Sequence, residues 1–286
     1  LFRVEAAPEC SPRGTEFCGL PVSGSLTRTP RNGFELEIRD YQRPDTLKPI
    51  EVPHRCCAGY AKSRGNRHVA GPASRTGPLA HELLVFAPHT DDGEFGCGGT
   101  IAKCTRLGIR VHYVAFSAAE ESVPADLPRD ILRHEVLKAT AKLGMDEGHV
   151  TVLKYPVRRF PEFRQDILED MIVLKKELDP AVVICPSRFD IHQDHRVIAD
   201  EAVRAFKDRT ILGYEMPWNN LSIATSCFSV LAEQDVDTKI EAVSCYMSQS
   251  FREYINPEFI RGLARVRGAQ IGVHYAEVFE VVRVVL

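Results

Sequence analysis

The sequence predicts an α/β domain built around a mostly parallel sheet. From about residue 81, short runs rich in β-branched and aromatic residues alternate with longer segments whose apolar residues recur at helical spacing. Repeated strand–helix–strand units of this kind favour parallel strands joined by right-handed crossovers. We therefore assign one regular domain to residues 81–286.

Residues 1–80 differ from the rest of the chain in composition. They hold half of its 18 prolines, and only FELEI at 34–38 alternates like a short strand. A segment without sustained apolar periodicity has little apolar surface to bury. We interpret residues 1–80 as an irregular or partly disordered N-terminal extension.

The regular domain begins with ELLVFA at 82–87, a continuous apolar run typical of a buried strand. The glycine-rich segment after it predicts a helix at 98–108, because its apolar residues stand three apart and Gly108 supplies a C-terminal stop. By the same criteria, further strands are expected at 110–117, 150–155, 181–185, 211–216, 227–231 and 275–284. Further helices are expected at 129–143, 161–178, 196–206, 235–248 and 257–267.

The composition excludes several classes of protein. With a net charge of −3 and no basic stripe, nucleic acid is not an expected partner. No apolar stretch approaches the roughly 18 to 20 residues that span a bilayer, and the start lacks the features of a signal peptide, so a cytoplasmic protein is expected. The nine cysteines lack CxxC spacing, which argues against a disulfide scaffold.

Two clusters of His and Asp follow predicted strands. HTDD at 89–92 comes directly after the strand at 82–87, and HQDH at 192–195 comes shortly after the strand at 181–185. In open parallel sheets, ligands bind outside the carboxyl ends of the strands. The sequence therefore predicts that the two clusters form one site.

The residue types in the clusters predict a catalytic metal centre. His89, Asp92 and His195 are the expected metal ligands, since three protein ligands and one open position are how catalytic zinc is held. A lone histidine or a pair of aspartates usually marks a solvated turn. Solvated turns, however, have no reason to repeat metal-ligand chemistry at two strand ends.

The remaining cluster residues have expected catalytic roles. Asp91 is suited to accept a proton from water as a general base. His192 is suited to stabilise an oxyanion or to protonate a leaving group. Asp194 is suited to accept a hydrogen bond from a histidine ring and so fix its tautomer.

With these motifs the chain resembles the LmbE/PIG-L-type zinc-dependent N-acetylglucosamine de-N-acetylases. The family pattern is HPDDE, then GcGGt, then HxDH. Here it appears as HTDD, with Glu94 displaced by the extra Gly93, then GCGGT at 96–100 and HQDH at 192–195. The resemblance covers residues 81–286. The displacement leaves the role of Glu94 open.

The resemblance implies a Rossmann-like fold, with helices on both faces of the sheet and zinc at the carboxyl ends of the strands. It also implies the same zinc ligands, with Asp91 as the base and His192 and Asp194 in the roles given above. Many members have a substrate-contacting arginine near the start of a helix with an E-x8-G pattern, here Glu135 to Gly144. Arg133 is the expected counterpart, with Arg129 as the alternative.

These observations predict a hydrolase that removes the N-acetyl group from an amino-sugar derivative, in surface polysaccharide or glycoconjugate biosynthesis. The expected partner is a small N-acetylated sugar, and the sequence leaves open its identity and whether it is free, nucleotide-linked or lipid-linked. One alternative is a non-catalytic module that binds a sugar or nucleotide sugar. Another is a non-haem iron oxygenase that uses a His-x-Asp…His triad, although such oxygenases mostly have all-β barrels.

Overall fold

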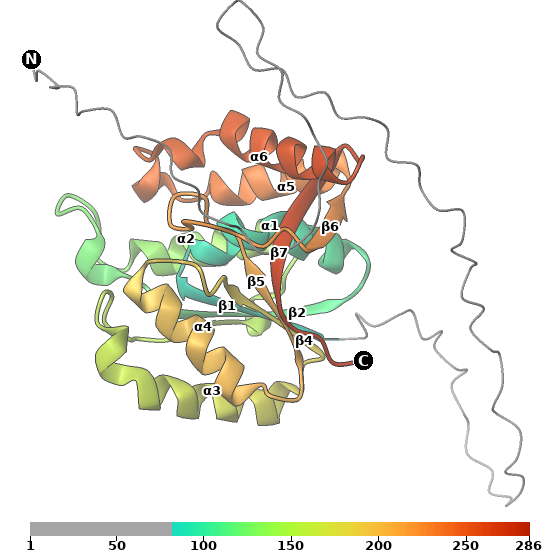
Figure 1. Cartoon of the computed structure of the whole chain (residues 1–286). Coiled ribbons are helices and arrows are strands. Elements are labelled where there is room, and N and C mark those ends of the chain that lie inside the picture. Colours follow the sequence, from blue (N-terminus) through green and yellow to red (C-terminus); the bar gives the residue numbers. More distant parts are fainter. Residues whose placement is uncertain (1–81) are drawn as a thin grey trace, which may run out of the picture. The chain divides into compact units, whose positions relative to one another are not determined.

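Seven strands form one sheet in the part of the chain that the computed structural model describes, residues 82–286 (Figure 1). The strands are β1 (Glu82–His89), β2 (Arg110–Ser117), β3 (Val150–Val152), β4 (Val182–Pro186), β5 (Thr210–Tyr214), β6 (Cys227–Leu231) and β7 (Tyr275–Arg283). They lie in the order β3-β2-β1-β4-β5-β7-β6. The extension predicted at residues 1–80 lies outside the described residues.

The sheet is mostly parallel, as predicted. The neighbours from β3 to β5 all pair in parallel, whereas β7 runs antiparallel to both β5 and β6. Parallel strands β1 and β4 are direct neighbours, although about a hundred residues separate them in the chain. This adjacency brings the segments that follow them to the same edge of the sheet.

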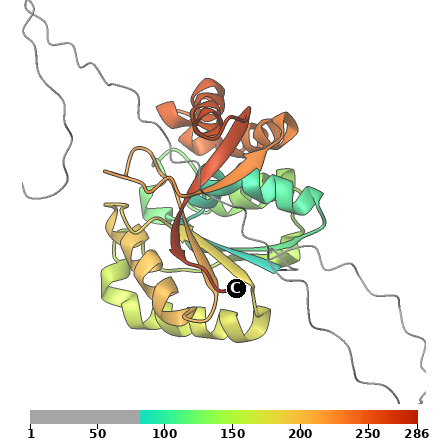
Figure 2. The ribbon, with the colours of Figure 1, turned by 45° about the vertical axis from the view of Figure 1, so that its right-hand side comes forward.

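Helices cover both faces of the sheet, which confirms the predicted layer arrangement. They are α1 (Asp92–Arg106), α2 (Ile131–Lys142), α3 (Arg164–Leu178), α4 (Gln193–Ala205), α5 (Glu233–Val243) and α6 (Pro257–Gln270). Short 3₁₀ turns lie at Glu120–Ser122, Glu147–His149, Phe160–Phe163, Met247–Gln249 and Glu253–Ile255. Helices α3 and α4 pack on one face, and α1, α2 and α5 pack on the other (Figures 1 and 2).

Strand β1 is buried on both of its faces, which explains its continuously apolar sequence. Leu83, Val85 and Ala87 belong to the core under α1, α2 and α5, while Leu84 and Phe86 belong to the core above α3 and α4. A strand buried on both faces has no solvent side that would need polar residues.

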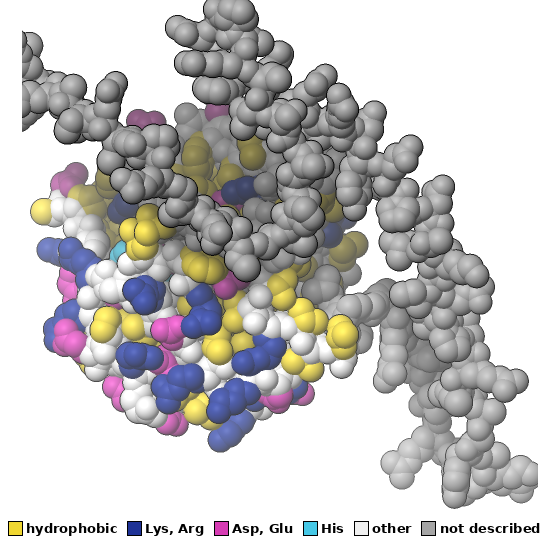
Figure 3. All heavy atoms as spheres, viewed as in Figure 1, with side chains coloured by type: hydrophobic (Ala, Val, Ile, Leu, Met, Phe, Trp, Pro, Cys, Tyr) yellow, Lys and Arg dark blue, Asp and Glu magenta, His cyan; other side chains and the backbone are white. Residues whose placement is uncertain are grey.

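On the outer surface seen in Figure 3, basic side chains are interspersed with acidic ones. None of the helices between residues 82 and 286 is long and apolar enough to cross a membrane.

The start of α1 corrects one prediction. The helix begins at Asp92, six residues before the expected start at 98, and its backbone breaks at Cys97, where φ is −147° and ψ is 23°. The glycines before the break hide the helical spacing of the apolar residues. They are required by close packing, because a Cβ atom at Gly96 would overlap the buried ring of Tyr214.

A buried ion pair holds the break in α1. The Glu277 carboxylate accepts hydrogen bonds from the backbone N–H groups of Gly99 at 2.9 Å and Thr100 at 2.7 Å, which begin the second part of the helix. The Lys239 ammonium group donates to the Phe95 carbonyl at 2.7 Å and lies 2.7 Å from Glu277. The charges of Lys239 and Glu277 are therefore paired with each other. Their contacts with the backbone on both sides of the break hold the first turn of α1 beneath the end of β1.

Candidate metal centre

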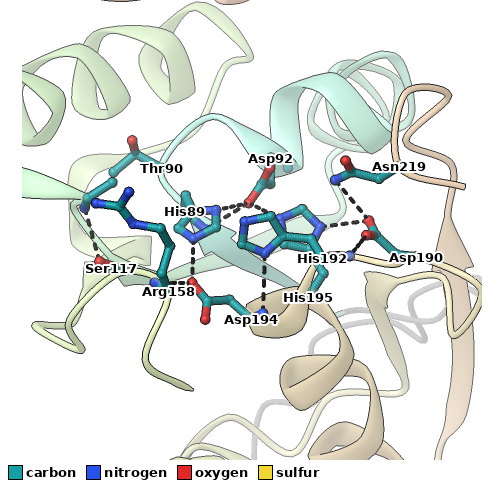
Figure 4. Close-up of polar contacts among 12 residues, drawn as sticks. His89, Thr90, Asp92, Ser117, Arg158, Asp190, His192, Asp194, His195 and Asn219 are labelled. Carbon is teal, nitrogen blue, oxygen red and sulfur yellow. Dashed lines mark hydrogen bonds and ion pairs between the residues drawn. The ribbon is translucent and has the colours of Figure 1, made fainter. Parts of the chain in front are cut away.

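The two predicted clusters meet at the carboxyl ends of the neighbouring strands β1 and β4. His89 is the last residue of β1, and Asp92 is the first residue of α1. His192 caps the N-terminus of α4, so His195 lies in the first turn of that helix. The prediction that both clusters would share one place in the fold agrees with this geometry (Figure 4).

Three side chains form a compact set of potential metal ligands. The Oδ2 atom of Asp92 lies 3.0 Å from Nδ1 of His89 and 3.2 Å from Nε2 of His195. Zinc ligands at about 2.0 to 2.1 Å in a tetrahedron lie about 3.3 Å apart, so these three atoms have suitable spacing for one ion. The two imidazoles and one carboxylate also match the donor set of catalytic zinc.

Each of the two histidines has a carboxylate on its other ring nitrogen. Asp194 Oδ2 lies 3.0 Å from His89 Nε2, and Asp190 Oδ2 lies 2.7 Å from His195 Nδ1. Partners of this kind orient a metal-binding ring and increase its basicity. The sequence analysis did not identify Asp190. Its position two residues before HQDH was the one signal that could have indicated it.

A second group, formed by His89, His192 and Asp194, also has ligand atoms close together. Its carboxylate is already engaged, because Asp194 accepts hydrogen bonds from the backbone N–H groups of Arg158 at 2.5 Å and Phe160 at 3.2 Å. No backbone N–H from a distant loop of the described chain donates to Asp92. Besides the two histidine rings, its Oδ2 atom accepts only the His89 backbone N–H, at 2.8 Å. The group with Asp92 is therefore the better metal site.

Without a metal, the two ligand histidines carry a positive charge and Asp92 carries a negative one. Burial lowers the pKa of His89, but the carboxylates of Asp92 and Asp194 outweigh it and raise that pKa to about 9. Burial likewise lowers the pKa of His195, but Asp92 and Asp190 raise it to about 10. The two histidines hold the pKa of Asp92 well below its usual value despite the opposing effect of burial. A bound cation would replace the two histidine protons.

Asp91 lines the same cavity, which has a volume of about 300 Å³. Burial, and then the charge of Asp92, raise the pKa of Asp91 to about 6. A carboxylate with a pKa near neutrality can both accept and return a proton. Asp91 is thus suited to general-base chemistry next to the ligand set.

His192 lines this cavity as a neutral hydrogen-bond donor. Its Nδ1 atom accepts the backbone N–H of Asp194 at 3.2 Å, so the ring proton belongs on Nε2. Burial, and then the neighbouring His195 and His89, lower the pKa of His192 to about 4. Of the two roles expected from the sequence, this arrangement favours oxyanion stabilisation over donation of a proton.

Glu94, whose role the sequence left open, lies beneath the metal-site turn. Its carboxyl group is fully buried and contacts the hydroxyls of Tyr113 and Tyr246, the latter at 2.9 Å. The same hydroxyls donate to the carbonyl of Thr90, at 2.8 Å and 2.6 Å respectively. Burial raises the pKa of Glu94 to about 8. Glu94 therefore supports the turn from below and does not line the cavity.

The structure does not bring Arg133 to the cavity. Its guanidinium donates to Glu120 at 2.9 Å and to the carbonyls of Val152 and Leu153 at the end of β3. The arginines that line the cavity are Arg158 and Arg252, neither of which the sequence motifs indicated. The helical position of Arg133 was visible in the sequence, but the direction of its side chain was not.

Comparison with known proteins finds a matching family model and a related deacetylase. Residues 84–206 match the family model of PIG-L, GlcNAc-PI de-N-acetylase. The uncharacterized deacetylase YaiS of Escherichia coli (strain K12) is 27% identical over 177 residues, which cover 58% of this chain and 90% of YaiS.

Two solved structures share the fold. N,N'-diacetylchitobiose deacetylase from Pyrococcus horikoshii has a TM-score of 0.59 and 24% identity, over 70% of this chain and 83% of that one. GalB, the 4-carboxy-2-hydroxymuconate hydratase from Pseudomonas putida KT2440, has a TM-score of 0.59 and 21% identity, over 72% of this chain and 98% of that one. Since one of the two is a hydratase, the fold alone does not specify the reaction.

Proposed function

We propose that this chain is a deacetylase of the PIG-L (LmbE-like) type, a zinc-dependent hydrolase that removes the N-acetyl group from an amino-sugar derivative. One observation carries the proposal. His89, Asp92 and His195 converge with their nitrogen and carboxylate ligand atoms, and Asp91 lies beside them in the same cavity. Zinc is preferred because two imidazoles and one carboxylate are a usual catalytic zinc set.

The chain's own residues supply the proton transfers. Zinc, when bound to His89, Asp92 and His195, would polarise the acetamide oxygen and make water more acidic. Asp91 takes a proton from a water molecule in the cavity as that water attacks the acetamide carbon. The His192 Nε2–H group donates a hydrogen bond to the oxygen on which negative charge develops. The protonated Asp91 then returns its proton to the nitrogen as the C–N bond breaks, which gives acetate and a free amine.

The substrate we propose is a small N-acetylated sugar, free or linked to a nucleotide or lipid. The α/β sheet argues against the alternative of an iron oxygenase, since the usual oxygenase scaffold is a barrel. A cytoplasmic location and a role in surface polysaccharide synthesis stay predictions from the sequence. Fractionation of cells that express the tagged chain would test the first of these.

Replacement of the proposed base tests the mechanism. We expect Asp91→Asn to lower acetate release from N-acetyl sugars by about 10²- to 10⁴-fold, because the amide cannot accept the proton. Zinc content, measured by atomic emission, should stay at the wild-type level, because Asp91 is not among the three ligands. Asp126→Asn, at an exposed position in the loop before α2, is the matched control. Near wild-type turnover by Asp91→Asn would contradict the proposal.

A further inference from the structure

Arg158 has a backbone conformation that arginine rarely adopts. Its φ angle is 67°, in the left-handed region. Among residues 82–286, only Ala119, Arg158 and Asp179 combine a positive φ with a side chain. Asp179 ends helix α3, where this conformation is common. The other two line the catalytic cavity.

The strained residue is tied directly to the candidate metal centre. The backbone N–H of Arg158 donates to Asp194 Oδ2 at 2.5 Å, and the same oxygen lies 3.0 Å from Nε2 of His89. Strained conformations persist where the surrounding structure enforces them, and they concentrate at functional sites. A glycine would adopt this φ without strain. At Arg158 the chain therefore keeps a long basic side chain at the cavity wall where glycine would be less strained.

The guanidinium group of Arg158 is free to bind a ligand. It extends beside His89 at the wall of the cavity (Figure 4), and no residue in the described range accepts a hydrogen bond from it. The adjacent Arg159 is different, since its Nε atom donates to Glu162 at 3.0 Å. Within residues 82–286, Arg158 therefore lacks the carboxylate partner that Arg159 has.

A second arginine lines the cavity without an ion-pair partner among the described residues. Arg252 donates from Nε to the neutral Gln249 side chain at 2.6 Å, and its guanidinium carbon lies 5.5 Å from the centre of the Tyr254 ring. The other polar contact of the Arg252 guanidinium in the described range is with the Tyr254 side chain. Both arginines therefore keep donors available for a ligand.

The two arginines of the cavity can bind an anionic group. Arg158 and Arg252 are the basic side chains among the described lining residues, and Asp91 and Asp92 are the carboxylates. A guanidinium fork matches phosphate and carboxylate groups by two parallel hydrogen bonds.

We propose that Arg158, together with Arg252, forms a subsite for an anionic group on the substrate, either a phosphate or a carboxylate. The substrates of this chain are then acidic N-acetyl amino sugars. This inference rests on the proposed deacetylase function, and it adds the charge of the substrate to it.

Steady-state kinetics of the zinc-loaded full chain test the subsite. The panel consists of N-acetylglucosamine as the neutral sugar, its 1-phosphate and 6-phosphate, and N-acetylmuramic acid as the carboxylate. We expect kcat/KM for at least one acidic sugar to exceed that of the neutral sugar by tenfold or more. The phosphate and carboxylate arms distinguish the two sources of charge. Equal kcat/KM values for all four would overturn the subsite.

Arg158→Gly is the informative variant, because glycine keeps the backbone N–H to Asp194 and relieves the strain. We expect its melting temperature not to fall, while the acidic-to-neutral ratio of kcat/KM falls at least tenfold. Arg158→Lys should retain part of the ratio. Arg159→Ala is the matched control and should keep the wild-type ratio. A ratio that survives in Arg158→Gly would contradict the proposal.

Binding separates this inference from the proposed function. Calorimetry on the zinc-loaded Asp91→Asn chain measures affinity for N-acetylglucosamine 6-phosphate and for the neutral sugar, without turnover. If no sugar in the panel releases acetate, the proposed function fails. The subsite nevertheless stands if the phosphate sugar binds more tightly and Arg158→Gly removes that difference. If the two sugars bind equally, the subsite fails whatever the activity.

Discussion

The two candidate metal-binding histidines each depend on a carboxylate that is not itself a ligand. Asp190 is the clearer case, because it is buried, it lies 2.7 Å from His195 Nδ1, and it also accepts the backbone N–H of His192 at 2.8 Å. One side chain thus orients a ligand and the residue proposed to stabilise the oxyanion. Its importance was not visible from residue type, since an aspartate in a loop is ordinary.

We expect Asp190→Ala to weaken zinc affinity by about 10- to 100-fold, because the His195 ring loses its orientation and part of its basicity. Competition with a chromogenic chelator measures the change. Asp200→Ala is the matched control, since Asp200 lies on α4, the helix that carries His195, and forms only a 3.7 Å surface contact with Arg188. Equal zinc affinity in both variants would show that Asp190 does not support the metal site.

The raised pKa values of His89 and His195 predict how metal binding depends on pH. With pKa values of about 9 and about 10, both rings are imidazolium cations, protonated on both nitrogens, at pH 7 in the metal-free chain. A cation needs the neutral rings, so protons compete with it. Zinc affinity should therefore rise with pH, by about tenfold per pH unit for each proton displaced, until pH 9. Chelator competition at pH 6.5, 7.5 and 8.5 tests this, and a pH-independent affinity would refute it.

At the scale of the elements, helix α1 links the sheet, the metal turn and the C-terminal part of the described chain. Its first turn carries Asp92, and its second part begins on the carboxylate of Glu277 from β7. The sequence pattern predicted only the second part, because glycines required by packing against Tyr214 and other side chains interrupt the apolar spacing. Strands were predicted better than this helix, since a strand buried on both faces leaves a continuous apolar run.

The buried pair of Lys239 and Glu277 gives a prediction for this element. We expect Lys239→Met to destabilise the fold by about 3 to 5 kcal/mol, since it leaves the Glu277 carboxylate buried without its counter-charge. The Phe95 carbonyl also loses a donor. Urea unfolding measures the free energy. Lys103→Met is the control, because Lys103 binds the Val230 carbonyl at the surface; similar stability of both variants would contradict the role of the pair.

At the scale of the molecule, both clusters and both apolar cores belong to the described part of the chain, residues 82–286. The ligands, the carboxylates behind them and both apolar cores lie in this range. The family match at residues 84–206 includes both clusters. That residues 81–286 suffice for the metal chemistry stays a prediction from the sequence.

Deletion of residues 1–80 tests this boundary. We expect the remaining chain to unfold cooperatively, to bind one zinc ion and to release acetate at a rate within a few fold of the full chain. Calorimetry and metal analysis of both chains provide the comparison. Loss of zinc binding in a shortened chain that still folds would show that the first eighty residues take part in the site.

The sequence by itself determined the class of the fold and the chemical types at the site. Apolar runs are local properties, so the strand before His89 and the strand before His192 could be found without the structure. The residue types of HTDD and HQDH were enough to nominate zinc ligands and Asp91 as a base. The order of the strands in the sheet depends on contacts between distant segments. Only the fold showed that β1 and β4 are neighbours.

The tertiary structure decided which atom faces which partner. It determined that Asp194 contacts His89, that Asp190 contacts His195, and that a backbone N–H fixes the proton of His192. It also brought Arg158, and not Arg133, to the cavity. These outcomes depend on backbone angles and on contacts between segments far apart in the chain, and no spacing in the sequence encodes the direction of a side chain.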